Sequence, residues 1–198
     1  MRAILVLLAA IAIALWHFMA TRPIAHAAGV IASEDPSQTE LDEAAIIPDG
    51  QFKLHPRAQF SADARVLSRE RYSQGALADI VPLDIAVGWG RMSDSDVLQK
   101  LEITQGNRFY YWHYENEPPI PRAEIEAHSA NWHIVPASDG VWKSLKNMRV
   151  GAVVHLEGLL VDIEGPEIGE IRTSLTRSDT GAGACEIIYV ESATVTAN

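Results

Sequence analysis

The sequence of 198 residues contains a single cysteine, Cys185. One cysteine cannot form a disulfide within the chain, so the fold cannot depend on disulfides for its stability. The chain must instead bury a sizeable hydrophobic core, for which ~150 residues in one domain are sufficient. In an oxidising compartment, a lone thiol is buried, reactive or paired with another chain.

Basic residues are also scarce, because 16 Lys and Arg stand against 26 Asp and Glu. Two of the basic residues and none of the acidic ones precede Gly29, so the chain from there on has 14 basic and 26 acidic residues, a formal net charge of −12. This balance argues against a nucleic-acid partner, because phosphate binding needs a basic surface. It also argues against a lipid-headgroup patch of clustered Lys and Arg. No nucleotide-binding motif occurs, and we expect no cofactor.

Long hydrophobic runs are absent except at residues 3–20 (AILVLLAAIAIALWHFMA). The run carries no formal charge and lies at the short end of the ~20 residues that cross a bilayer. We predict a hydrophobic helix here that anchors the chain in the inner membrane by a single pass, with the rest in the periplasm. The alternative is a signal peptide, because Ala25-His26-Ala27 fits the A-x-A cleavage pattern and cleavage near Ala27 would leave a soluble periplasmic protein.

The chain divides into three parts on composition: an anchor or signal peptide at 1–28, an acidic segment at 29–50 and one globular domain at 51–198. The acidic segment has two prolines and no sustained period, which is typical of a linker or of a segment draped over a domain.

Short strands dominate the pattern of the domain, with a few short helices between them. The clearest hairpin pairs residues 101–104 with 109–114, around a turn in which Gly106 and Asn107 tolerate positive φ. Helices are expected near 125–127 and from Ser138 or Asp139 to Met148. The pattern predicts a β-rich α+β fold, either a small curved antiparallel sheet or an OB-like barrel, with an irregular β-sandwich as the alternative.

Two histidines and an asparagine lie close together in residues 126–136, EAHSANWHIVP. His128 and His133 are five residues apart, an offset that diverges on a helix and points to opposite faces of a strand. They can share a ligand only if residues 129–131 form an irregular turn. We predict such a turn between a helix that ends near His128 and a strand at 132–135. The turn is either purely structural, a ligand-binding or catalytic site, or a metal site for which the spacing specifies no third ligand.

A second polar stretch, RTSLTRSDTGAGACEI, covers residues 172–187. Polar side chains alternate along its first half, which is unusual beside a core. The glycines that follow expose backbone N–H groups that can form an anion-binding nest. We therefore predict binding of a small anionic ligand. The predicted ligand-binding residues are Arg172, Ser174, Thr176, Arg177 and Asp179.

Cys185 lies just beyond these glycines and is the candidate nucleophile of an acyl-transfer or hydrolytic site. In this hypothesis His128 or His133 is the general base and Asn131 orients it. The structural alternative is a buried cysteine on a strand face with Ile187, since free cysteine is among the most buried residue types.

The stretches GWGRMSD (88–94), EAHSANWHIVPA (126–137) and SLTRSDTGAGACE (174–186) resemble those of an uncharacterised family of proteobacterial proteins. The likeness covers most of residues 30–192. In that family a hydrophobic N-terminal segment precedes one soluble domain, so the resemblance implies an anchored protein with a single exported domain and implies no activity. We expect a binding or accessory protein of the cell envelope that acts on an envelope protein or a small ligand, and the alternative is a Cys/His-dependent hydrolase or acyl transferase.

Overall fold

The computed structural model of the chain describes Ile11, residues 22–176, Gly181 and residues 183–196. The predicted hydrophobic helix at 3–20 lies outside these residues apart from Ile11, and so do Arg177 and Asp179. Across the described part, none of the helices combines the length and the apolar character that a membrane crossing requires.

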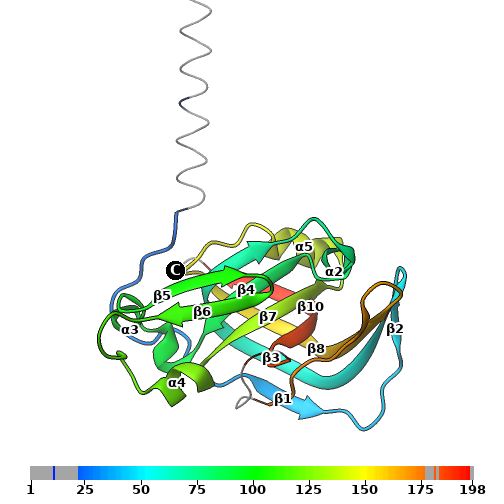
Figure 1. The fold of residues 1–198 in the computed structure, drawn as a ribbon, viewed down its shortest axis with the longest axis horizontal. Coiled ribbons are helices and arrows are strands. Elements are labelled where there is room, and N and C mark those ends of the chain that lie inside the picture. Colours follow the sequence, from blue (N-terminus) through cyan, green and yellow to red (C-terminus); the bar gives the residue numbers. More distant parts are fainter. Residues whose placement is uncertain (1–10, 12–21, 177–180, 182, 197–198) are drawn as a thin grey trace, which may run out of the picture.

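Five strands close into a ring, which Figure 1 shows as the body of the molecule. Each strand pairs with the next, and the last pairs with the first. In the order in which they pair, the strands are β3 (Phe52–Arg71), β4 (Leu83–Gly88), β7 (Ser129–Pro136), β10 (Glu186–Thr196) and β8 (Val153–Gly165). The prediction of a β-rich fold with few helices is therefore confirmed.

Of the two predicted arrangements, the small antiparallel sheet does not form, because β7 and β10 run parallel while the other four pairs of the ring are antiparallel. The reason is geometric. Strand directions around a closed ring cannot alternate throughout when the number of strands is odd, so a ring of five needs a parallel pair. Closure removes the unpaired edges that an open sheet would expose.

The long strand β3 makes the closure possible. Its first part pairs with β8 and its last part with β4, and Arg65 lies at the crossover between the two. Sequence patterns predict separate extended pieces broken by Pro56, but β3 is continuous. Pro56 is accommodated at a register shift between Pro56 and Ala58, the kind of position at which a strand tolerates the missing N–H.

Segments outside the ring attach to it at several places. The acidic segment follows the domain surface, where β1 and β2 pair with β3 (Figure 1). At the other end of the chain, β9 pairs antiparallel with the end of β8. A separate hairpin consists of β5 and β6. The remaining elements are β1 (Ser37–Glu40), β2 (Ile47–Asp49), α2 (Ala76–Ile80), the 3₁₀ helix η1 (Gly90–Ser93), α3 (Ser95–Leu98), β5 (Glu102–Gly106), β6 (Phe109–His113), α4 (Arg122–Ala127), α5 (Asp139–Leu145) and β9 (Gly169–Ile171).

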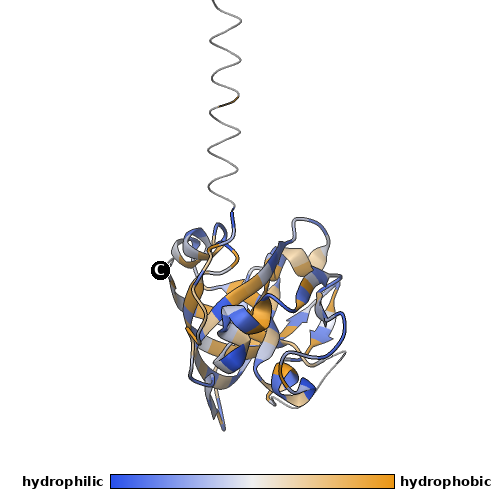
Figure 2. Cartoon of the chain, turned by 90° about the vertical axis from the view of Figure 1, so that its left-hand side faces the viewer, coloured by the Kyte–Doolittle hydropathy of each residue, from blue (hydrophilic) through white to orange (hydrophobic). Residues whose placement is uncertain are grey.

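The ring encloses the main core. Side chains that alternate along each strand point inward, among them Leu83, Ile85 and Val87 of β4 and Trp132 and Ile134 of β7, and all five are at most 1% exposed. Figure 2 shows apolar residues interspersed with hydrophilic ones along the strands, as expected for strands with one buried face. Burial of one such side chain contributes roughly 1.5–3 kcal/mol to folding, so this core stabilises the domain without a disulfide.

The β5–β6 hairpin packs on the outer face of the ring, where Tyr110 and Trp112 join a cluster built on Ala86 and Met92. Its turn is one residue later than the sequence indicates, because the positive φ angles fall at Asn107 (55°) and Arg108 (70°) and Gly106 belongs to β5. This shift places the side chain of Arg108 at the tip of the hairpin, directly over the outer face.

Candidate thiol and ligand-binding site

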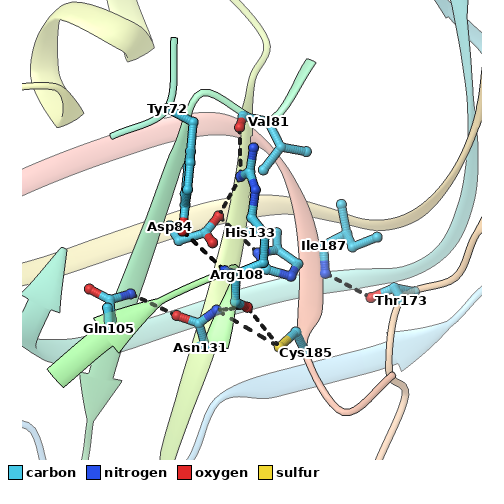
Figure 3. A network of polar contacts seen from close by, with 10 residues as sticks. All are labelled: Tyr72, Val81, Asp84, Gln105, Arg108, Asn131, His133, Thr173, Cys185 and Ile187. Atoms are coloured by element: carbon cyan, nitrogen blue, oxygen red, sulfur yellow. Dashed lines mark hydrogen bonds and ion pairs between the residues drawn. The ribbon is translucent and has the colours of Figure 1, made fainter. Parts of the chain in front are cut away.

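Asp84 is the centre of a polar network on the outer face of the ring (Figure 3). Its neighbours Leu83 and Ile85 point into the core, so the alternation of the strand turns Asp84 outward, beneath the hairpin. The residue is fully buried, and its Oδ1 accepts hydrogen bonds from Arg108 Nη1 and His133 Nδ1, each at 2.9 Å. A buried carboxylate is stable only when it is paired in this way.

The register of the sheet brings His133 to Asp84, since the two residues are direct partners across β4 and β7. His133 also lies beside Ile187 of β10. Cys185 immediately precedes β10, and Figure 3 shows its thiol on the same side of the sheet as Asn131 and His133. Three segments that are distant in sequence therefore bring a carboxylate, an imidazole and a thiol together.

The electrostatics of this network hold His133 in its charged form. Burial lowers the pKa of the imidazole, but the hydrogen bonds to Asp84 and Cys185 and the negative charge of Asp84 outweigh burial and raise the pKa to about 9. His133 is therefore an imidazolium at neutral pH.

Arg108 supplies the second cation. Its guanidinium donates to Val81 O as well as to Asp84, and lies 3.5 Å from the centre of the Tyr72 ring. Burial, followed by the charge of Asp84, raises the pKa of Tyr72 to about 12, so the phenol keeps its proton. Together these contacts fasten the tip of the hairpin to the ring.

Asn131 does not orient a histidine, contrary to prediction. Its Oδ1 accepts from Gln105 Nε2 at 2.8 Å, and its Nδ2 donates to Arg108 O at 2.9 Å and lies 3.8 Å from Cys185 Sγ. The residue that orients His133 is Asp84. Asn131 instead fixes the hairpin and directs an amide toward the thiol.

His128 is not part of this network, so its predicted role as the base is wrong. The expected turn at 129–131 does not form, because β7 begins at Ser129 directly after α4. Five residues of extended chain separate the Cα atoms of His128 and His133 by roughly 16 Å. His128 lies against Trp89, with Nε2 3.8 Å from Asp35 Oδ1, and the shared metal or ligand site is excluded. In the portion of the chain that the structure describes, no group of three His, Cys, Asp or Glu side chains is placed to hold a metal ion.

A cavity of about 300 Å³ opens beside the thiol. Its described lining combines aromatic rings, two carboxylates and small polar groups, without a Lys or Arg among these residues. The lining residues are Trp89, Phe109, Tyr110, Tyr111, Trp112, Glu126, Ala127, Ser129, Ala130, Asn131, Thr176, Gly181, Ala184, Cys185 and Glu186.

The segment that follows β9 forms one wall of the cavity. It is not the polar strand that the sequence indicates, since β9 ends at Ile171. Thr176 lines the cavity, and Ser174 N donates to Cys185 O at 3.0 Å. Arg172 pairs with Glu170 on the exposed surface, and is not among the lining residues. Arg177 and Asp179, also predicted to bind a ligand, lie outside the described residues.

Sequence reasoning missed Asp84 and Arg108. A signal for Asp84 was present, because it interrupts the otherwise apolar run of β4, and aspartate is almost never fully buried unless it is paired. Arg108 carried no comparable signal, since basic residues are ordinary in turns.

Comparison with protein-family models, with characterised protein sequences and with solved structures found no match to this chain. The family resemblance described above therefore stays an expectation.

Proposed function

We propose that this protein is a membrane-tethered domain on the periplasmic side of the inner membrane that binds a small, uncharged saccharide of the cell envelope in the cavity beside Cys185. The observation that supports it most is the position of that cavity, which lies against β7, the hairpin and the segment that precedes β10.

The arrangement of the ring corresponds to the OB type. Taking β3, β4, β7, β8 and β10 as strands one to five, the third and fifth strands are parallel, the first pairs with the fourth, and α5 connects the third to the fourth. OB barrels bind oligonucleotides and oligosaccharides on the face of strands two and three and with the loop between strands four and five. The cavity occupies that region, between β7 and the segment that joins β9 to β10.

The lining favours a saccharide over an oligonucleotide. Phosphates would meet Glu126 and Glu186 in a domain that already carries an excess of acidic residues. A sugar ring offers an apolar face to aromatic side chains such as Tyr111. Its hydroxyl groups can donate to the two carboxylates of the lining.

Titration of the full-length chain in detergent with N-acetylglucosamine and its oligomers, followed by amide NMR, tests the proposal. We expect saturable shifts in residues 109–112 and 126–131. Tyr111→Ala should weaken binding about tenfold, because it removes the exposed aromatic face on which the sugar ring would pack, and burial of apolar surface of this size contributes roughly 1–2 kcal/mol. The control is Tyr114→Ala, an aromatic residue just past β6 that does not line the cavity. Equal loss in both variants, or no saturable shift with any saccharide, would contradict the proposal.

The tether has a separate test, because an anchored protein recovered from its host keeps the N-terminus near Met1. A chain that begins at Ala28 would establish cleavage instead and a soluble periplasmic protein.

A further inference from the structure

We propose that Cys185 is a nucleophile that accepts the acyl group of an uncharged carboxylic ester held in the cavity, with His133 as proton donor and acceptor and Asp84 as the positioning residue of His133. The proposal rests on the proposed binding site, since the cavity must hold the alcohol part of the ester.

The first support is the accessibility of the thiol. Cys185 is partly exposed and lines the cavity, so a bound carbonyl group can reach Sγ. Its position just before β10 is held by Ser174 N, which donates to Cys185 O at 3.0 Å, and by Ile187 N, which donates to Thr173 Oγ1 at 3.0 Å. A structural cysteine packed in the core would have no opening to solvent.

The second support is the order of the polar groups. Asp84 Oδ1 accepts from His133 Nδ1 at 2.9 Å, which leaves Nε2 as the ring nitrogen that can exchange a proton with sulfur or substrate. Asp84 is itself held by Arg108, so the carboxylate cannot turn away from the imidazole. A nucleophile, a base and a group that orients the base form the arrangement that activates cysteine and serine nucleophiles.

The surroundings of Cys185 Sγ include one hydrogen-bond acceptor and one donor. Cys185 Sγ lies 3.9 Å from Arg108 O, which would accept a hydrogen bond from a protonated thiol. Asn131 Nδ2 lies 3.8 Å from the same sulfur and is a donor. The same amide is placed to donate to an oxyanion that forms on a carbonyl attacked by sulfur.

The proposed reaction has two steps. The thiolate of Cys185 attacks the carbonyl carbon, a carbon–sulfur bond forms, and the carbon–oxygen bond to the alcohol breaks as His133 gives its proton to the leaving oxygen. Water then attacks the thioester, and neutral His133 takes a proton from it. The acid is released, and Cys185 returns to the thiolate.

The class of ester follows from the cavity. Glu126 and Glu186 in the lining disfavour an anionic substrate, and the aromatic residues favour an alcohol part with a ring. p-Nitrophenyl acetate is a probe of this class, because it is uncharged and its leaving group is an aromatic ring.

The experiment uses full-length protein in detergent and p-nitrophenyl acetate, with nitrophenolate release followed by absorbance and acylation by peptide mass spectrometry. We expect a burst of about one nitrophenolate per chain and one acetyl group on Cys185. Cys185→Ser should remove the burst. Asp84→Asn and His133→Asn should slow acylation at least tenfold at pH 7. The pH profile of the rate should lose its dependence on an imidazolium in His133→Asn and should shift to lower pH in Asp84→Asn.

The chain offers a matched control on its surface. His155 Nδ1 lies 3.1 Å from Asp63 Oδ1 in an exposed pair without a cysteine, so His155→Asn and Asp63→Asn should leave the burst unchanged. Near-UV circular dichroism of each variant establishes that it is folded. If a variant fails to fold, the reactivity of Cys185 is measured on the wild-type protein instead, by alkylation with iodoacetamide at pH 6.5. We expect a rate about ten times that of free cysteine.

A Cys185 that reacts with neither reagent until the protein is denatured would overturn the proposal and leave a packed thiol that donates to Arg108 O. Acetylation at the rate of free cysteine, unaffected by His133→Asn, would overturn it as well. Saccharide binding by Cys185→Ser distinguishes this failure from failure of the proposed function. If binding persists while wild-type Cys185 is inert, only the nucleophile is wrong.

Discussion

Replacing Asp84 with asparagine should destabilise the domain strongly and also discharge His133 at neutral pH. Asp84 is fully buried, and its Oδ1 accepts from both Arg108 and His133. Removal of one partner of a buried ionic group leaves uncompensated charge, at a cost of roughly 3–5 kcal/mol.

The magnitude can be refined from the other carboxylate oxygen. Asp84 Oδ2 is buried and has no hydrogen-bond partner among the described residues, so an amide nitrogen in that position would be an unsatisfied donor. That donor costs about 1–3 kcal/mol, whereas the amide oxygen of asparagine keeps one of the two bonds that Oδ1 accepts. We expect a net loss of about 3 kcal/mol, a large part of the 5–15 kcal/mol that is typical of a domain.

Urea unfolding followed by tryptophan fluorescence measures the free energy of unfolding, and NMR titration of the imidazole measures the pKa of His133. With Asp84 neutral, burial keeps lowering the pKa of His133 while its main opposing partner is gone, so the pKa should fall from about 9. Asp63→Asn, at the exposed pair with His155, should change stability by less than about 0.5 kcal/mol. An Asp84→Asn protein as stable as wild type, with the pKa of His133 still near 9, would show that Asp84 neither stabilises the fold nor holds the charge of His133.

Stability should also depend on pH. The pKa of His133 is raised above its ordinary value of 6.5 to about 9, so its contribution to stability is complete below pH 6.5 and is lost as pH rises through 9. The decrease is about 3 kcal/mol at most. Urea unfolding between pH 6 and 10 should detect it, and His133→Asn should flatten the pH dependence. Gly158→Ala should cost about 2 kcal/mol of stability, because a Cβ there would collide with the backbone carbonyl of Tyr189. Gly106→Ala should be neutral, because nothing lies within 4 Å of the added Cβ. Equal thermal midpoints for the two variants would contradict the packing of β8 on β10.

Local features were predictable from the sequence because short-range chemistry decides them. Ser138 caps α5 through its side chain, which accepts from Val141 N, and Val141 and Leu145 of that helix are buried as expected. The hairpin at 102–113 follows from two alternating aromatic and β-branched stretches around a turn. Residues 93–96 (SDSD) offer both Ser93 and Asp94 as the N-cap of α3, and Asp94 takes this role because Ser93 Oγ is already bonded to Ala32 and Gly90. Competition of this kind between a local cap and a distant partner cannot be read from the sequence.

The candidate site was predictable only in part. Cys185, His133 and Asn131 stood out as chemically able residues in polar stretches, and the structure brings all three together. His128 stood out for the same reason, yet the extended conformation of β7 sends it to a different neighbourhood. The strand β7 begins at Ser129 and not at the predicted 132, which leaves no turn to bring the two histidines together, and such boundaries depend on packing.

By itself, the sequence determined the β-rich class of the fold, the need for a core without disulfides, the acidic character of the domain and a few capped helices and turns, because composition and neighbouring residues control these properties. Tertiary structure alone decided the rest. Closure of five strands into a ring imposed the parallel pair of β7 and β10, and that pairing carries Cys185 to His133 across more than fifty residues of sequence. Asp84 acquired its role only when the register of β4 and β7 placed it opposite His133 and the hairpin brought Arg108 over it. Register and closure arise from the sum of many weak contacts over the whole core, which no single stretch of sequence contains.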